Sequence, residues 1–260
     1  MTKKSQSIIN KLSPFLALAI LVLLWWSATA TGAVPSFMLP KPADVVTAFV
    51  GDFTILMRNA AVTLTEAFAG LAIGITLAFV LSTLMDRFDV LYKALYPLLV
   101  VTQTVPTIAI APLLMLWMGF GMAPKITLVV LTTFFPIIVS LLDGYKSVDE
   151  DAVRLLRSMG AGRMQIFRYI KLPSAIPSFF AGLKVSASYA VVGAVISEWL
   201  GGFEGLGVYM TRVRKAYAFD KMFAVIIFTT VISLILMWVV TLLRKLSMPW
   251  ERKGNEHEKH

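Results

Sequence analysis

The sequence has no cysteine and only two histidines, His257 and His260, both at its end. Disulfide bonds and thiolate metal sites are therefore excluded, and a histidine-based site is not expected. Charged residues make up only 15% of the chain, whereas soluble domains contain about 25%. The sequence contains no Gly-Lys-Ser or Gly-Lys-Thr, which the phosphate-binding loop of P-loop ATPases requires. We therefore expect neither a soluble protein nor a chain that hydrolyses ATP itself.

Apolar residues make up 58% of the 260 residues and gather in long blocks. A block of roughly 20 apolar residues can cross a bilayer as a helix, so we predict an all-α polytopic membrane protein. In the second block, Gly70 and Gly74 have a spacing that lets helices approach closely. Six spans are predicted, at residues 12–30, 60–85, 94–118, 125–142, 179–200 and 222–243.

The first block permits two interpretations. Trp25 and Trp26 end its apolar run, as expected where a helix meets the lipid–water boundary. The small residues that follow are also typical of a secretory signal peptide, whose removal would leave five spans. The length of the block favours an uncleaved first helix. Residues 43–57 then form an amphipathic piece, which we expect to be a surface helix in an external loop.

Lys and Arg predict the orientation, because they concentrate on the cytoplasmic side of membrane proteins. Most of the 24 lie in the termini and in the segments after the second and fourth spans, which places both termini inside. Arg212, Arg214 and Lys215 are exceptions to this distribution, because they lie in a predicted external segment. They either form a docking surface for an acidic protein face or belong to a solvated amphipathic helix; attraction of an anionic substrate is a third interpretation.

The longest charged segment between two apolar blocks follows the fourth span. Ser147 and Glu150 have the spacing of a capping box at a helix start. Gly160 and Gly162 are expected to end this helix, and Pro173 to end a second short one. One apolar stripe recurs at helical spacing, at Ala152, Leu155, Leu156 and Met159. The pattern predicts an internal helix–turn–helix, although an ordinary solvated hairpin would show the same pattern.

Part of this segment resembles a known motif. Gly160, nine residues and then Ile170-Lys171-Leu172-Pro173 resemble the second half of the EAA motif, EAA-x3-G-x9-I-x-LP, of the membrane subunits of bacterial binding-protein-dependent ABC importers. Residues 102–106, 111–114 and 175–184 are similar to the same family, most of all to its sulfonate/taurine/nitrate-type branch, which includes thiamine-precursor permeases. The chain departs from the motif at Arg154-Leu155-Leu156, so a contact made by the family's Glu is not carried over.

The resemblance implies a type I ABC importer transmembrane fold with about six helices and cytoplasmic termini. The chain would be a non-catalytic permease subunit of the bacterial inner membrane that binds no cofactor. Its partners would be a second copy, two ATPase subunits that bind ATP and Mg2+, and an extracytoplasmic substrate-binding protein. The solute would be small and polar, either a thiamine pyrimidine precursor or a sulfonate- or nitrate-like anion. The implied divisions are 1–54 (first helix and external segment), 55–245 (transport core with the coupling helix at about 147–173) and 246–260 (polar cytoplasmic tail).

The same resemblance implies which residues couple the chain to the ATPase. The short helix before Gly160 would be the coupling helix, and its apolar stripe would lie in a groove of the ATPase. The implied coupling residues are Glu150, Ala152, Leu155, Leu156, Met159, Gly160, Ala161, Ile170, Leu172 and Pro173.

Polar residues within the spans are candidates for a substrate path, because ionisable groups in a bilayer are costly. Pro106 frees a backbone carbonyl that needs a partner in the bundle or in a water-filled cavity, although an ordinary kink remains the alternative. Glu198 either lines the path or is a helix-end carboxylate, and Glu66 is expected to bond to a neighbouring threonine, Thr63 or Thr65. The path candidates are Gln103, Thr104, Pro106, Tyr189, Ser197 and Glu198.

Two other classes of protein are weighed against an importer subunit. A stand-alone ion-coupled transporter or channel would not need the Gly160 motif, and it would usually show inverted repeats, which are not evident. A membrane enzyme would need clustered histidines, cysteines or paired carboxylates, which the pattern does not offer.

Overall fold

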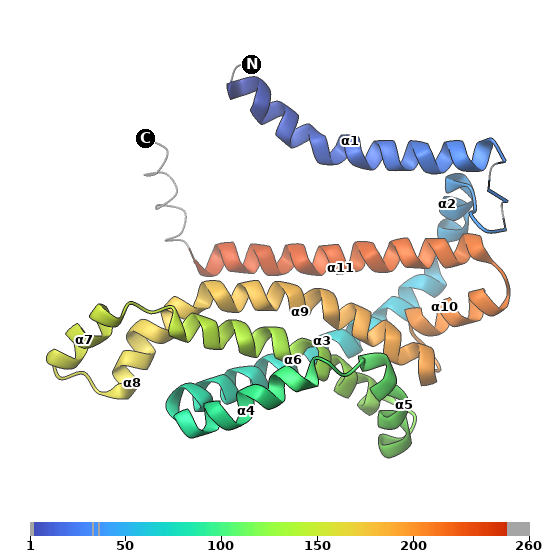
Figure 1. The fold of residues 1–260 in the computed structure, drawn as a ribbon. Coiled ribbons are helices and arrows are strands. Elements are labelled where there is room, and N and C mark those ends of the chain that lie inside the picture. The colour runs from blue at the N-terminus through green and yellow to red at the C-terminus, as the bar shows by residue number, and fades with distance from the viewer. Residues whose placement is uncertain (1–2, 33, 36, 249–260) are drawn as a thin grey trace. The chain divides into compact units, whose positions relative to one another are not determined.

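The computed structural model describes residues 3–32, 34–35 and 37–248, with 3–12 as backbone only. These residues form an all-α protein, as predicted, and the described part contains no strand. The predicted tail at 246–260 and the two histidines lie almost wholly outside the described residues. In chain order the helices are α1 (Lys3–Ala30), α2 (Pro42–Gly51), α3 (Phe53–Arg87), α4 (Asp89–Thr102), α5 (Thr107–Met118), α6 (Met122–Lys146), α7 (Glu150–Ser158), α8 (Arg163–Ile166), the π turn η1 (Phe167–Lys171), α9 (Leu172–Gly201), α10 (Leu206–Lys215) and α11 (Phe219–Ser247) (Figure 1).

Within the described residues, five helices are long and apolar enough to cross a membrane. They contain the first, second, fourth, fifth and sixth predicted spans. The prediction of an unbroken third span at 94–118 is wrong, because α4 and α5 are two helices bent by 100°. Counting this bent pair as one crossing gives six.

The break between α4 and α5 has a local cause. Gln103 and Thr104 donate their backbone N–H groups to carbonyls three residues back, which tightens the end of α4. Pro106 has no N–H group and disfavours helical backbone at the residue before it. Pro106 then serves as the N-cap of α5 with extended backbone. The proline therefore ends one helix and begins another instead of kinking a continuous one.

The chain divides into two compact units, and each is described by itself. The first contains the chain up to Arg58 together with Tyr209–Phe228. Its small apolar core holds Val45, Ala48 and Ala224. The Trp25 ring packs on Phe223, with centroids 6.0 Å apart, and its indole N–H donates to the Pro40 carbonyl at 3.0 Å. These contacts tie the end of α1 to α2 and to the start of α11.

An aspartate holds the polar side of this first unit together. The carboxylate of Asp52 accepts hydrogen bonds from the Tyr209 hydroxyl at 2.6 Å and from Lys221 Nζ at 2.7 Å. Lys221, followed by Tyr209, lowers the pKa of Asp52 because both stabilise its ionised form. Burial, followed by the neighbouring carboxylate, raises the pKa of Tyr209, so its phenol remains a donor.

This pairing predicts a stability that depends on pH. Because the folded-state pKa of Asp52 is lowered, its contribution is complete above the unfolded pKa of about 4 and is lost as pH falls through the folded value. The difference in apparent melting temperature between the wild-type protein and Asp52→Asn should therefore shrink as the buffer is taken below about pH 4. When both proteins also carry Tyr209→Phe, the difference in melting temperature at neutral pH should be smaller, because Asp52 has lost one of its two donors. A difference that stayed constant into the acid range would contradict the assignment.

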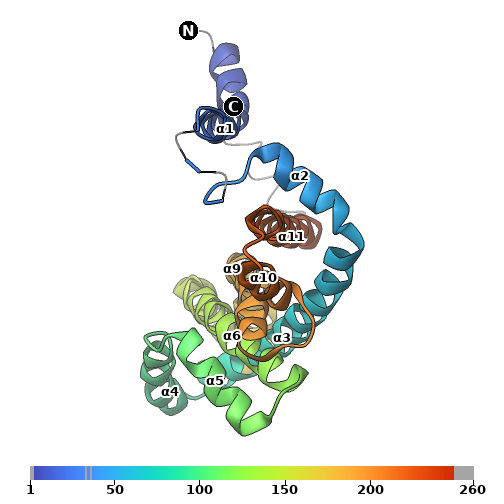
Figure 2. The ribbon, with the colours of Figure 1, turned by 90° about the vertical axis from the view of Figure 1, so that its right-hand side faces the viewer.

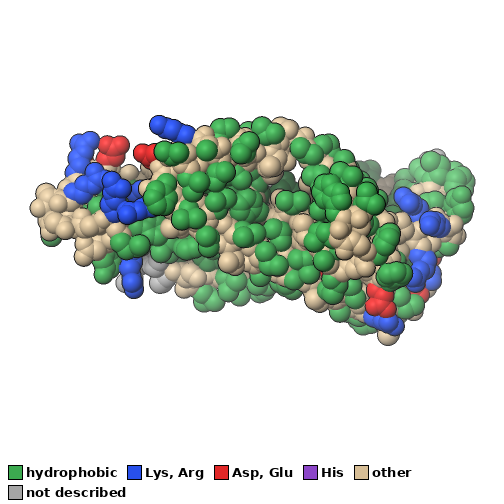
Figure 3. All heavy atoms as spheres, turned by 90° about the horizontal axis from the view of Figure 1, so that it is seen from below, with side chains coloured by type: hydrophobic (Ala, Val, Ile, Leu, Met, Phe, Trp, Pro, Cys, Tyr) green, Lys and Arg blue, Asp and Glu red, His purple; other side chains and the backbone are tan. Residues whose placement is uncertain are grey.

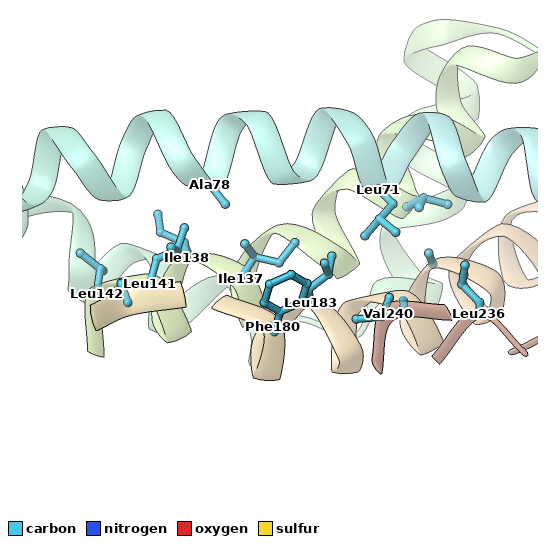
Figure 4. Packing of buried hydrophobic residues seen from close by; sticks show 14 of the residues in the cluster. Leu71, Ala78, Ile137, Ile138, Leu141, Leu142, Phe180, Leu183, Leu236 and Val240 are labelled. Atoms are coloured by element: carbon cyan, nitrogen blue, oxygen red, sulfur yellow. The ribbon is translucent and has the colours of Figure 1, made fainter. Parts of the chain in front are cut away.

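The second unit, Asn59–Val208 with the chain from Thr229, carries the main core. Buried residues of α3, α6, α9 and α11 meet there, among them Leu71, Ile137, Leu183 and Leu236 (Figure 4). Figure 2, turned to look from one end, shows α3, α6 and α9 gathered together. These helices position the functional features described below.

Small residues let these helices approach closely. A Cβ atom on Gly70 would lie 2.5 Å from the Val129 side chain, and one on Gly74 would lie 2.6 Å from Thr133 Oγ1. The prediction from the Gly70–Gly74 spacing is therefore confirmed. The pair α6 and α9 is equally close, because a Cβ on Gly144 would lie 2.7 Å from Ala175 Cα and one on Gly182 would lie 2.6 Å from the Pro136 carbonyl oxygen.

Candidate functional site

A helical hairpin joins α6 to α9 and forms the first candidate feature. It consists of α7, a short turn and α8, and it lies beyond the paired ends of α6 and α9 (Figure 1). Lys and Arg side chains gather at this end of the molecule in Figure 3, while apolar side chains cover much of the neighbouring face. Arg154, Arg157, Arg163 and Arg168 of the hairpin are exposed. The predicted helix–turn–helix is therefore present.

The start of α7 differs from the prediction. Asp149 is the N-cap, and its carboxylate accepts a hydrogen bond from the N–H of Asp151 at 2.9 Å. The predicted capping box of Ser147 and Glu150 is wrong, because α6 continues to Lys146 and the Ser147 hydroxyl donates back to the Gly144 carbonyl at 3.0 Å. Ser147 therefore belongs to the end of α6.

The end of α7 confirms the role of Gly160. The N–H of Ala161 donates to the Leu156 carbonyl at 2.9 Å, and the N–H of Gly160 donates to the Arg157 carbonyl at 3.0 Å. This is the Schellman arrangement, and it places Gly160 at φ +86°, where glycine is favoured. Gly162 does not help to end α7, because it is the N-cap of α8 and its N–H donates to Gln165 Oε1 at 2.7 Å.

Pro173 does not end the second helix, which corrects the prediction. The helix that begins at Arg163 runs through the π turn η1 into α9 and ends at Gly201. Pro173 lies in the first turn of α9, directly after the π turn. Because a π turn widens the hydrogen-bond pattern, the missing proline N–H is accommodated there without a break. Ile170 and Leu172 are half-buried at this base of the hairpin.

The apolar stripe of α7 has no cover within the described chain. Leu155 is 62% exposed and Met159 73%, Ala152 and Leu156 are partly exposed, and no residue of α7 is buried. Arg154, which stands where the motif has Glu, pairs with Glu150 at 3.0 Å and Asp151 at 3.6 Å on the exposed surface. An uncovered apolar stripe beside charged pairs is what a helix that docks on a partner shows.

A buried polar network lies near the other end of α9. Glu198 is 1% exposed; its Oε1 accepts from the Thr63 hydroxyl at 2.7 Å and its Oε2 accepts from the N–H of Gly207 at 2.6 Å. Thr63 in turn accepts from the N–H of Leu206 at 2.9 Å, and Asn59 Oδ1 accepts from the N–H of Gly205 at 2.8 Å. The Glu198 carboxylate thereby fastens the start of α10 to α9 and, through Thr63, to α3, while Asn59 of α3 holds the loop before it.

A buried ion pair adjoins this network. Lys125 Nζ of α6 lies 2.7 Å from Glu66 Oε1 of α3, and the two side chains are 6% and 0% exposed. The expected bond of Glu66 to Thr63 or Thr65 is wrong, because Thr63 donates to Glu198 and Thr65 to the Ala61 carbonyl. The sequence could not indicate the pair, since its members are 59 residues apart.

The predicted path residues fall into two groups. Gln103, Thr104 and Pro106 lie together in the break between α4 and α5, and all three are exposed, as is Tyr189 at 50%. Ser197 and Glu198 are buried, and the Ser197 hydroxyl donates to the carbonyl of Ala194 in its own helix. Both therefore bond inside the chain, while the first group and Tyr189 face outward from it.

The three basic residues of the predicted external segment lie on α10. Arg212, Arg214 and Lys215 are exposed, whereas Tyr209 and Val213 on the other side of this helix are buried. The helix is therefore amphipathic, and the first unit presents its basic side to the surroundings.

Comparison with known proteins identifies the architecture. Residues 70–247, more than half of the chain, match the family described as the binding-protein-dependent transport system inner membrane component. The chain belongs to this family. This permease is therefore a multi-pass protein of the bacterial inner membrane and a subunit of an ABC transporter. The alternative of a stand-alone ion-coupled transporter or channel is not favoured.

Relatives of this permease place it in the predicted branch. It is 34% identical over 243 residues to the formylaminopyrimidine transport permease protein ThiX of Halalkalibacterium halodurans, covering 93% of this chain and 97% of that protein. It is 27% identical over 241 residues to the taurine transport system permease protein TauC of Escherichia coli, covering 90% and 87%.

Solved structures share the fold. A bacterial ABC transporter for import of the acidic polysaccharide alginate matches with a TM-score of 0.65 and 15% identity, over 94% of this chain and 99% of that one. An amino acid ABC transporter matches with a TM-score of 0.64 and 16% identity, over 76% and 97%. The permease thus has an ABC importer transmembrane fold, as its motif predicted.

Proposed function

We propose that this permease imports a small polar solute, driven by a separate ATPase that docks on the hairpin. The observation that carries the proposal is the uncovered apolar stripe of α7 at the end of two long spans. In the proposed complex, Ala152, Leu155, Leu156 and Met159 lie in a groove of the ATPase. Gly160 and Ala161 fix the end of α7. The half-buried Ile170 and Leu172 hold the base of the hairpin in the bundle, and the exposed Pro173 follows in the first turn of α9.

The hairpin faces the cytoplasm in this proposal, together with both termini. The basic side chains at this end support that orientation, because Lys and Arg are retained on the inner side of the membrane. ATP and Mg2+ are bound by the ATPase, so the permease itself is a non-catalytic transport subunit. Arg154 takes the place of the motif's Glu, and Glu150 supplies the acidic group one turn earlier.

The path for the solute lies between two copies of the permease in this proposal. The break at Gln103, Thr104 and Pro106 exposes polar groups in the middle of an apolar pair of helices. Tyr189 is exposed on α9, and one copy provides no cover for it. These residues form the proposed wall of the path. Ser197 and Glu198 are buried behind it and would hold the helices of the wall in place.

The relatives suggest the class of solute. The names of ThiX and TauC assign formylaminopyrimidine and taurine to those proteins. We infer that this permease carries either a thiamine pyrimidine precursor or a sulfonate- or nitrate-like anion. An extracytoplasmic binding protein delivers it and docks on Arg212, Arg214 and Lys215, whose positive charge favours encounter with an acidic surface.

Cysteine crosslinking tests the docking of the ATPase. Because the chain has no cysteine, Met159→Cys introduces a single thiol on the stripe. In membranes that hold the whole transporter, a short bifunctional thiol reagent should join this residue to a cysteine placed in the groove of the ATPase. Phe203→Cys, 80% exposed near the Glu198 network, is the matched control and should give no such product.

Two results would contradict the proposal. One is that neither Met159→Cys nor Leu155→Cys crosslinks to the ATPase. The other is that an impermeant thiol reagent added to intact cells labels Met159→Cys from outside.

A further inference from the structure

The base of the hairpin contacts one corner of the bundle at two points. Lys171 Nζ, where η1 meets α9, lies 2.6 Å from Asp86 Oδ1 near the end of α3. Lys146, the last residue of α6, donates to the Tyr92 hydroxyl of α4 and lies 4.0 Å from the centroid of its ring. The segments that enter and leave the hairpin are therefore both fastened to the corner between α3 and α4.

The ion pair between Lys171 and Asp86 is better shielded than the charge pairs on α7, whereas Lys146 is exposed. The Lys171 and Asp86 side chains are 28% and 17% exposed, whereas Arg154 and Glu150 are 70% and 83% exposed. Shielding from solvent strengthens an ion pair, since exposed pairs contribute little. Tyr92 is also braced, because its ring stacks on Tyr96 with centroids 5.0 Å apart. A moving hairpin would therefore pull on this corner.

The corner leads directly to the break in the bent pair. Helix α4 runs from Asp89 to Thr102, and Pro97 lies within it without ending it. From Tyr92 to Gln103 is about 16 Å along a helix at 1.5 Å per residue. One helix thus separates the fastened corner from the exposed residues at 103–106, of which Gln103 and Thr104 are polar.

We propose that Asp86, Lys171 and Lys146 are positioning residues that clamp the base of the hairpin to the corner between α3 and α4 and so transmit its movement along α4 to the break at 103–106. This inference rests on the proposed function, since the ATPase is what would move the hairpin. Helices α6 and α9 would receive the movement directly, because they are continuous with the hairpin. The clamp would pass it on to α3 and α4, which are not. It assigns a role to three side chains outside the docking stripe.

Thiol accessibility in the break tests the clamp. Val105→Cys introduces a single thiol where the native side chain is 42% exposed. The permease with its ATPase is placed in lipid nanodiscs, and the rate of maleimide labelling is measured without nucleotide and with ATP, Mg2+ and vanadate. We expect a several-fold change in rate with the clamp intact. Asp86→Asn and Lys171→Met should abolish the change while the ATPase still binds and hydrolyses ATP.

Two further variants separate a clamp from a general defect. The exchanged pair Asp86→Lys with Lys171→Asp should restore the response, because it restores the attraction. Lys93→Met removes an exposed lysine next to Tyr92 and should leave the response unchanged. Where Asp86→Asn or Lys171→Met fails to assemble, Lys146→Met decides instead, and it should reduce the response.

The outcomes are distinct for the two proposals. A response that persists in Asp86→Asn and Lys171→Met, or a Val105→Cys background that does not respond to ATP, overturns the clamp alone. Loss of response in the exchanged pair as well as in both single variants also overturns it. An ATPase that neither co-purifies with the unaltered permease nor hydrolyses ATP beside it overturns the proposed function.

Discussion

Replacing Lys125 by methionine should lower the free energy of unfolding by about 3–5 kcal/mol, because removing one partner leaves the other charge buried and unpaired. Lys125 and Glu66 are 6% and 0% exposed, and 2.7 Å separates their charged atoms. Methionine keeps most of the volume of lysine, so packing changes little. Glu66 would then have to remain charged without its partner or take up a proton.

The double variant Lys125→Met with Glu66→Leu is the matched control. Removing both members of a buried pair can be neutral, so most of the lost stability should return. The measurement is the apparent melting temperature in detergent, followed by fluorescence-detected size-exclusion chromatography after heating. A double variant as unstable as Lys125→Met alone would show that packing at this position, not charge, sets the stability.

Replacing Gly205 by alanine should cost about 4 kcal/mol, since backbone strain and overpacking each contribute about 1–3 kcal/mol. Gly205 has φ +126°, and an added Cβ would lie 2.1 Å from Glu198 Oε1 and 2.2 Å from its Cδ. The carboxylate cannot move aside freely, because Thr63 and Gly207 hold both of its oxygens. The loop before α10 should detach, which limited proteolysis at Glu204 would report.

Gly160→Ala separates the two causes. Gly160 also has positive φ, +86°, but an added Cβ would meet nothing within 4 Å. This variant should lose only the strain, about 1–3 kcal/mol, confined to the hairpin. If Gly205→Ala were no more harmful than Gly160→Ala, the overlap with Glu198 would not contribute.

The sequence predicted the membrane spans and the hairpin well, because both are local patterns. Apolar blocks identified the helices, and the Gly70–Gly74 spacing identified a close contact that the structure confirms. Gly160 was assigned correctly because a Schellman ending needs only neighbouring residues. The family was evident from Gly160 and Ile170-Lys171-Leu172-Pro173, and the match over 70–247 confirms it.

The wrong predictions concern two kinds of residue. Some have a neighbour that can play the same role, and others have a partner that is distant in the sequence. Ser147 and Asp149 are both good N-caps, and only the length of α6 decides between them. Pro173 usually stops a helix, but a π turn just before it absorbs the missing hydrogen bond. Partners for Glu66 and Asp86 are 59 and 85 residues away, which no local pattern reveals.

Glycines at the contact between α6 and α9 limit how this permease can change shape. Gly144 and Gly182 bring one backbone against the other, and a Cβ on Gly193 would lie 2.9 Å from Thr132 Oγ1. Shear motions are small slides of packed helices, and these close backbone contacts leave little room for the two helices to slide past each other. The two helices are thus expected to tilt as one rigid block, so any slip plane between transport states must lie on their outer faces.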